Sequence, residues 1–168
     1  MKTGVRLPWR YIPRICKRTQ RCLTEAETSL LRGEVQRMLK EGAIEQTDRT
    51  DLVLRSLYTV PKKNGKPRAA VHLRWINSHL HRKHFKMSTM RDVKAALTQG
   101  CYMTMLDLKD CFWALPVAPQ DRRFLAFEFE GKKYLFKVLP FGLGPSPMLI
   151  TKLYRRVVEY LLAREHRV

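Results

Sequence analysis

Two aspartates three residues apart are the first candidates for chemistry. Asp107 and Asp110 stand in the segment MLDLKDCF (105–112), directly after an apolar run. A carboxylate at the end of a buried strand, beside a basic surface, suits a hard divalent cation held against phosphate oxygens. Positions i and i+3 of a strand face opposite ways, so both acids can face one metal only if the chain turns after Leu108. Otherwise one binds the metal and the other positions backbone or a basic partner.

Taken alone, this pair of acids is more simply explained as a helix cap or as surface charge. The second candidate is a turn rich in glycine and proline, LPFGL (139–143) followed by GPSP (144–147). A rigid, glycine-bearing turn that leads into a helix lets a ligand approach the backbone closely. Its composition is also that of an ordinary loop, so the turn by itself specifies no ligand.

The third candidate is a basic hairpin around Asn64 and Gly65, a dipeptide that favours tight turns. Arginine offers a two-pronged guanidinium and lysine a mobile point charge, and both suit a triphosphate or a nucleic-acid backbone. A solvated hairpin face explains the same residues equally well. The cations are Lys62, Lys63, Lys66 and Arg68.

The elements that must position these residues follow from hydrophobic periodicity, and together they predict an α+β fold. Thr24 and Glu27 form a capping box for the first helix, and Gly131 turns the later hairpin. The predicted elements are a helix over about 25–41, strands at 54–60 and 68–76, a helix from Ser88 or Thr89 to Gly100, a buried strand at 102–108, a hairpin of 125–130 with 134–138, and a final helix carrying Leu149, Leu153, Val157 and Leu161.

Composition limits the class of protein. A chain of 168 residues with 45% hydrophobic residues has room for one ordinary domain with a packed core. The sequence contains neither an apolar run long enough to span a membrane nor a signal peptide. We therefore expect an intracellular protein, in the nucleus or the cytoplasm, that is neither secreted nor membrane-bound. The four cysteines lack CxxC spacing, so we expect free thiols.

The net charge of +18 is the strongest compositional signal. Residues 1–23, which we expect to form a basic extended arm, contain seven Lys or Arg and no acid, and residues 52–91 also lack Asp and Glu. A chain this basic repels itself unless a polyanion is present, so nucleic acid is the expected partner. On charge alone, a solvated basic face or a ribosomal type of RNA binder is the competing interpretation.

The order of the motifs adds specificity. The sequence resembles the reverse transcriptases of retroelements, most closely the gypsy and DIRS-like groups, from about residue 22 to the end. This resemblance implies a right-hand polymerase fold with fingers at about 24–87 and 115–147 and an incomplete palm at about 88–114 and 148–168. The motifs are GAIEQ (42–46), TVPKKNGKPR (59–68), LRWIN (73–77), FKM (85–87), LDLKDCF (106–112), LPFGL (139–143) and ITK (150–152).

The resemblance also implies roles for individual residues. Asp107 would be the catalytic carboxylate that binds two Mg²⁺ ions, and the backbone of Asp110 and Cys111 would bind the triphosphate of a deoxynucleotide. Phe112 stands at the family's steric gate against a ribose 2′-hydroxyl, although it could also be an ordinary core ring. Phe141 and Gly142 would line the nucleotide pocket.

The basic hairpin would complete that nucleotide site. Arg68, with either Lys62 or Lys63, matches the residues that grip the phosphates. Arg74 and Asn77 match positions that support the fingers and an RNA or DNA template-primer.

Two departures from the family pattern matter. His72 replaces an acid two residues before Arg74, and the loss of one such surface ion pair costs only about 0–1 kcal/mol. The family's Tyr-x-Asp-Asp motif does not occur in the sequence. With one of three expected metal ligands, we expect this chain to be inactive alone and to depend on the remaining polymerase and ribonuclease H segments of a parent polyprotein. A non-catalytic nucleic-acid-binding module, or a relic, is the alternative.

Overall fold

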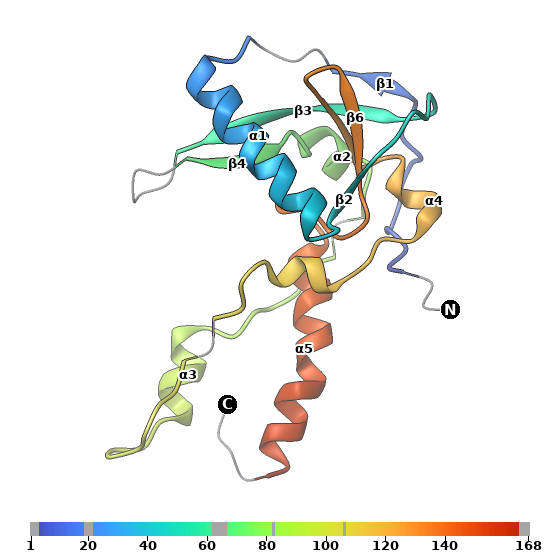
Figure 1. Cartoon of the computed structure of the whole chain (residues 1–168). Helices are drawn as coiled ribbons and strands as arrows, with labels where there is room; N and C mark the ends of the chain where they lie inside the picture. Colours follow the sequence, from blue (N-terminus) through green and yellow to red (C-terminus); the bar gives the residue numbers. More distant parts are fainter. Residues whose placement is uncertain (1–3, 19–21, 62–66, 82, 106, 165–168) are drawn as a thin grey trace.

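The fold is built on one mixed β-sheet (Figure 1). The computed structural model describes residues 4–18, 22–61, 67–81, 83–105 and 107–164. Within these ranges the main path of the sheet runs β1-β3-β5-β6-β2, and β4 pairs with β3 beside this path. The strands are β1 (Cys16–Lys17), β2 (Ile44–Gln46), β3 (Val53–Val60), β4 (Arg68–Val71), β5 (Ala126–Phe129) and β6 (Lys132–Phe136). This arrangement confirms the predicted α+β class.

Strand β3 is the centre of the sheet because it pairs along both edges. Its first half lies parallel to β1 on one side and to β5 on the other, with Leu54 opposite Ala126. Its second half pairs antiparallel with β4, with Val60 opposite Arg68. The predicted hairpin is therefore present, while its tip, including Lys62 and Lys63, lies outside the described residues.

Helix α1 (Glu25–Lys40) covers the core beside β3 and β4. The capping box predicted from sequence forms, since the Thr24 hydroxyl oxygen accepts from the Glu27 N–H at 3.2 Å and Glu27 accepts from the Thr24 N–H at 3.0 Å. The helix buries Leu31, Val35 and Met38 at the predicted spacing. Each such side chain contributes roughly 1.5–3 kcal/mol when it leaves water.

The second predicted hairpin also forms. β5 and β6 pair antiparallel around Glu130 and Gly131, whose φ angles of 48° and 73° are those of a type I′ turn. Phe127 is fully buried and contacts the rings of Tyr134 and Phe136. This aromatic cluster joins the hairpin to the core beneath α1.

The described part of the N-terminal segment, residues 4–18, is built into the body of the protein. Leu7 is 4% exposed, and its N–H donates to the buried Asp121 carboxylate of α4 (Pro119–Arg122) at 2.9 Å. The Trp9 indole N–H donates to the same carboxylate at 3.0 Å, and its ring packs edge-on against Phe124. The arm then adds β1 to the edge of the sheet.

Two sequence predictions are wrong. The strand expected over 68–76 ends at Val71, and residues 74–78 instead form α2 (Arg74–Ser78). The buried strand expected over 102–108 is absent from the described part of this segment, where Tyr102, Met105 and Leu108 are exposed. A strand needs a neighbouring strand for its backbone hydrogen bonds, and no described strand lies beside this segment.

Two helices project from the sheet on the same side (Figure 1). Helix α3 (Met90–Ala96) has Thr89, one of the two predicted caps, as its N-cap residue. It ends before Gly100 and lies apart from the sheet. Helix α5 (Ser146–Leu162) matches the predicted final helix, and Leu153 and Val157 on it are exposed. Among the described residues, no helix has the length and apolar character needed to cross a membrane.

Candidate nucleotide site

The motif that contains the two aspartates turns sharply at Asp110. This residue has a φ of 48°, in the left-handed region, and immediately precedes the short 3₁₀ helix η1 (Cys111–Ala114). For a residue with a Cβ atom, left-handed backbone costs roughly 1–2 kcal/mol, so surrounding contacts must hold the turn. The chain does turn after Leu108, which was the condition for both acids to face one site.

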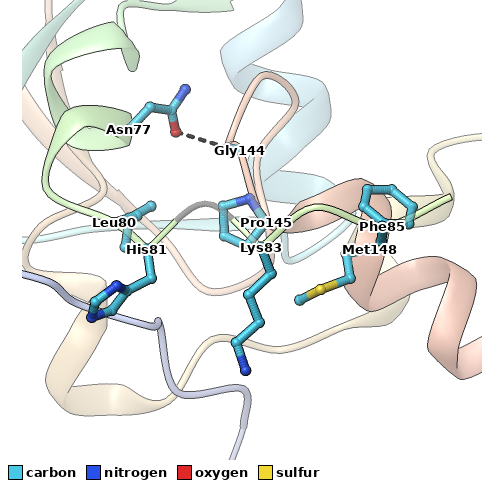
Figure 2. A pocket seen from close by; sticks show the side chains of 8 residues that line it. All are labelled: Asn77, Leu80, His81, Lys83, Phe85, Gly144, Pro145 and Met148. Carbon is cyan, nitrogen blue, oxygen red and sulfur yellow. Dashed lines mark hydrogen bonds between the residues drawn. The ribbon is translucent and has the colours of Figure 1, made fainter.

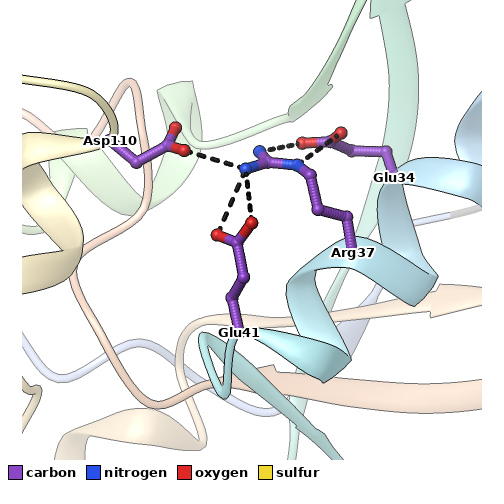
Figure 3. Close-up of polar contacts among 4 residues, drawn as sticks. All are labelled: Glu34, Arg37, Glu41 and Asp110. Carbon is purple, nitrogen blue, oxygen red and sulfur yellow. Dashed lines mark hydrogen bonds and ion pairs between the residues drawn. The ribbon is translucent and has the colours of Figure 1, made fainter.

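Asp110 is held by an arginine of helix α1 (Figure 3). The Arg37 guanidinium donates to the Asp110 carboxylate at 2.8 Å. The same guanidinium donates to Glu34 and Glu41, and Asp110 thus has the basic partner that was one of the two sequence alternatives. The hydrogen bond to Glu34, with a smaller contribution from Asp110, raises the pKa of Arg37 above its usual range although burial opposes this.

An aromatic contact joins this motif to the glycine- and proline-rich turn. The rings of Phe112 and Phe141 meet edge to face with centroids 5.1 Å apart. Phe112 is partly buried against the core, whereas Phe141 is 45% exposed. Phe141 also borders a small cavity of about 40 Å³, which is lined in part by Ala70 and Trp113. Two segments predicted separately to contact a nucleotide are therefore brought together.

The turn itself is fixed by the side-chain amide of Asn77 (Figure 2). Asn77 donates to the Gly142 carbonyl at 2.9 Å and accepts from the Gly144 N–H at 2.8 Å. Gly142 has a φ of 86°, which glycine adopts without strain. Asn77 reaches the turn from the end of α2, so LRWIN and LPFGL form one structural unit.

A larger cavity of about 270 Å³ opens beside this unit (Figure 2). Its wall combines polar side chains, His81 and Lys83, with apolar ones, Phe85 and Met148. The cavity lies between the segment after α2 and the start of α5. Such a mixed, partly cationic surface can accommodate both the phosphate and the sugar of a polynucleotide.

Two of the remaining predicted residues, Arg68 and Asp107, lie within the described ranges. Arg68 is exposed at the start of β4, on the same face of that strand as Ala70 of the small cavity. Asp107 is exposed, and three residues of chain place its Cα within about 10 Å of that of Asp110. Within the described ranges the Asp107 carboxylate has no hydrogen-bond or ion-pair partner, and Lys62 and Lys63 lie outside those ranges.

The side chains of this region can be compared with the ligands that the divalent metal ion of the resembled family would need. Magnesium prefers oxygen ligands and keeps several waters, so it is bound through one or two carboxylates plus substrate phosphates. The exposed, unpaired carboxylate of Asp107 has the right chemistry, and Asp110 is engaged by Arg37. No group of three or more potential metal ligands occurs among the described residues. The chemistry of the Asp107 carboxylate is compatible with one protein ligand.

A cationic cluster that sequence reasoning missed lies around β3. Arg55 is 6% exposed and stacks on the Trp75 ring at 4.0 Å, while its Nε has no hydrogen-bond partner among the described residues. His72 stacks on Tyr58. Burial, followed by the charges of Arg18, Arg74 and Arg55, lowers the pKa of His72. His72 therefore belongs to a crowded basic surface.

Comparison with known proteins identifies the family. The model of the family described as "Reverse transcriptase (RNA-dependent DNA polymerase)" matches residues 60–166, which is more than half of the chain. The chain belongs to the reverse transcriptase family. The matched region contains Asp107, Phe112, Phe141 and Gly142, so the contact between the two motifs is one between family segments.

Viral relatives agree with this assignment to the reverse transcriptases. The Pro-Pol polyprotein of feline foamy virus is 34% identical over 114 residues, which are 68% of this chain and 10% of the relative. The Gag-Pro-Pol polyprotein of sheep pulmonary adenomatosis virus is 31% identical over 140 residues, or 77% of this chain and 8% of the relative. The chain thus spans about a tenth of the length of these polyproteins.

Solved reverse transcriptases share the fold. A crystal structure of prototype foamy virus protease–reverse transcriptase matches with a TM-score of 0.71 and 28% identity, covering 95% of this chain and 20% of that one. A foamy viral protease–reverse transcriptase in complex with double-stranded DNA matches with a TM-score of 0.70 at 24% identity. These matches confirm the predicted reverse transcriptase polymerase fold.

Arg37 is the residue of this site that sequence reasoning missed. It occupies a polar position of a predicted amphipathic helix, where a solvated side chain is the ordinary expectation. Its acidic neighbours Glu34 and Glu41, three and four residues away, suggest only pairing along the helix. No local pattern signals that Asp110, 73 residues later, also binds it.

Proposed function

We propose that this chain supplies the fingers and the first part of the palm of an RNA-directed DNA polymerase. The observation that carries the proposal is the ring contact between Phe112 and Phe141. It joins the motif with the aspartates to the glycine-bearing turn, and both border one surface that a deoxynucleoside triphosphate can occupy. The proposed boundaries are an arm over 1–23, fingers over about 24–87 and 115–147, and palm over about 88–114 and 148–168.

Each residue of this surface takes a role suited to its chemistry. Backbone N–H groups at Asp110 and Cys111 bind phosphate oxygens, and Phe112 excludes a ribose 2′-hydroxyl by its bulk. Phe141 and Gly142 form the opposite wall, where the lack of a side chain at Gly142 permits close approach. Arg68, with Lys62 or Lys63, binds the triphosphate from the fingers.

Asp107 is the proposed catalytic and metal-binding carboxylate. When bound, Mg²⁺ would polarise the phosphoryl group and neutralise charge that develops during transfer. The exposed and unpaired state of the carboxylate supports this role, since an acid already engaged by an arginine, like Asp110, has a competing partner.

An RNA or DNA template-primer is the proposed macromolecular partner. The net charge of +18 supports this, as do His81 and Lys83 on the wall of the larger cavity. Affinity for a polyanion that depends on released counterions must fall steeply with salt. By its motifs the parent element is of the gypsy or DIRS-like type, with further polymerase and ribonuclease H segments, acting inside the cell.

A chimeric enzyme tests the polymerase function directly. Residues 22–164 would replace the matching stretch of prototype foamy virus protease–reverse transcriptase, the solved relative with the same fold. The chimera is expected to extend a DNA primer on an RNA template. Asp107→Asn should lower the rate by roughly three orders of magnitude, because several kcal/mol of metal-dependent stabilisation are lost.

The matched control is Asp48→Asn, the same substitution at an exposed loop position, and it should leave extension unchanged. Phe112→Ala should raise incorporation of ribonucleotides relative to deoxynucleotides. A folded chimera that binds template-primer but extends nothing would favour the non-catalytic nucleic-acid-binding module instead.

A further inference from the structure

Arg37 touches both ends of the turn that begins η1. Its guanidinium donates to the Asp110 carboxylate at 2.8 Å and lies over the Trp113 ring at 4.7 Å from the centroid. Phe112 stands between these two residues in sequence and contacts Phe141. The two contacts that Arg37 makes with the motif therefore flank Phe112 in the sequence.

Pairing within helix α1 does not require Asp110. Glu34 accepts from Arg37 at 2.6 and 3.1 Å, and Glu41 accepts at 3.2 Å, so two carboxylates of the same helical region already neutralise the guanidinium (Figure 3). The third carboxylate leaves the group with an excess of negative charge. The pairing of Asp110 with Arg37 therefore matters for the motif at 105–112 rather than for helix α1.

The ion pair between Arg37 and Asp110 affects both the backbone geometry of the motif and the charge beside it. The left-handed backbone of Asp110 is unfavourable for a residue with a Cβ atom, and the ion pair holds it in place. An Asp110 carboxylate released from Arg37 would also stand free beside the surface where phosphates are proposed to bind. Like charges repel, so the ion pair, which directs the Asp110 carboxylate toward α1, holds that charge away from an anionic ligand.

From this geometry we infer that Arg37 is a positioning residue for the nucleotide pocket: it fixes the Asp110 turn and the Phe112 ring, and it keeps the Asp110 carboxylate away from the triphosphate. This inference rests on the proposed nucleotide-binding function. Arg37 acts through Asp110 and Trp113 and touches no reacting atom.

The test compares Arg37→Met with Arg32→Met in the 168-residue chain. Arg32 lies on the same helix and pairs with Glu130 on the surface, so it controls for loss of a cation from α1. Two measurements are made: hydrogen exchange of the backbone amides of residues 110–115, and binding of dTTP with Mg²⁺ by titration. Arg37→Met should weaken dTTP binding about tenfold and speed exchange at 110–115 by a similar factor, as loss of a charge-assisted hydrogen bond predicts.

Arg32→Met should change neither quantity, and exchange in β3 and β5 should stay protected in both variants. Arg37→Lys, which keeps the charge but cannot reach all three acids, should fall between wild type and Arg37→Met and serves if Met impairs folding. Unchanged exchange at 110–115, or equal dTTP affinity in wild type and Arg37→Met, overturns the inference. Wild-type protein that binds no dTTP instead contradicts the proposed nucleotide site.

Discussion

The amide of Asn77 holds both glycines of the turn between β6 and α5, donating to Gly142 at 2.9 Å and accepting from Gly144 at 2.8 Å. One side chain thereby satisfies a carbonyl and an N–H of this turn. The contact is close, because a Cβ atom at Gly144 would meet the Asn77 Oδ1 at 3.4 Å, an ordinary van der Waals distance. The wall of the proposed nucleotide pocket therefore depends on a residue of α2.

Replacing Asn77 by Asp should loosen this turn. A carboxylate keeps the acceptor for the Gly144 N–H but cannot donate to the Gly142 carbonyl, and two acceptors then face each other. We expect a loss of about 1–3 kcal/mol in the free energy of unfolding, measured in urea. Ser78→Ala, on the same helix, is the control and should lose less. Unchanged stability and unchanged exchange at Gly144 would show that the amide is dispensable.

Two glycine-to-alanine substitutions should change the free energy of unfolding in opposite directions. Gly142 has a φ of 86° with open space around it, so alanine there costs only the backbone strain, about 1 kcal/mol. Gly33 lies inside α1, also with open space, and alanine there should stabilise by roughly 0.5–1 kcal/mol. Thermal unfolding of the two variants measures the difference. A destabilising Gly33→Ala would contradict the described helix.

Removal of the Asp121 carboxylate should release the N-terminal segment. Asp121 is 2% exposed and accepts from the Leu7 N–H and the Trp9 indole N–H, and it also pairs with Arg6. Asp121→Ala leaves buried donors without acceptors, and we expect a loss of about 2–4 kcal/mol. Limited proteolysis should cleave within residues 4–18 much faster than in Asp48→Ala, which alters an exposed acid. Equal cleavage would refute the docking role of Asp121.

Stability should depend on the protonation of His72. Burial and three nearby arginines lower its pKa in the folded protein, so below its ordinary pKa of about 6.5 the unfolded chain binds the proton more readily. Stability should therefore fall as pH drops from 7 through 6.5 toward the lowered value. His72→Gln should flatten this dependence in urea unfolding at pH 7 and pH 5. His84→Gln, at an exposed position, is the control; the same pH profile in wild type and His72→Gln would exclude the effect.

The 168-residue chain alone should not extend a primer. Asp107 is the single motif carboxylate free to bind metal, and the sequence contains no Tyr-x-Asp-Asp. Incubation with template-primer, deoxynucleotides and Mg²⁺ should therefore give no product, while the proposed binding of nucleic acid should still be measurable and should weaken with salt. Extension that Asp107→Asn abolishes would show that one carboxylate suffices.

Sequence reasoning succeeded where local signals dominate. The capping box at Thr24, the alternation around Phe127 and the four-residue spacing of Leu149 to Leu161 each depend on neighbours along the chain. It also paired β3 with β4 through the turn residues between them. Contacts between distant segments were not predictable in this way, and the parallel pairing of β1 with β3 is an example.

The strand predicted over 102–108 shows where a local signal is not sufficient. An apolar run bounded by charge is typical of a buried strand, yet burial requires partners that periodicity does not specify. Within the described residues, Tyr102, Met103 and Met105 remain exposed. For the site, the family motifs identified Phe112, Phe141 and Gly142, whereas the ion pair of Arg37 with Asp110 could only be found in three dimensions.

The hydrogen bond between Leu7 and Asp121 joins residues 114 positions apart, and this separation has a consequence for biosynthesis. On a ribosome, the segment that contains Leu7 emerges before α4 and cannot dock until α4 has left the exit tunnel. During that interval its basic, partly apolar residues are available to other molecules, including RNA and chaperones. Order of synthesis and order of assembly are thus reversed for this part of the protein, and its docking should be a late event in folding.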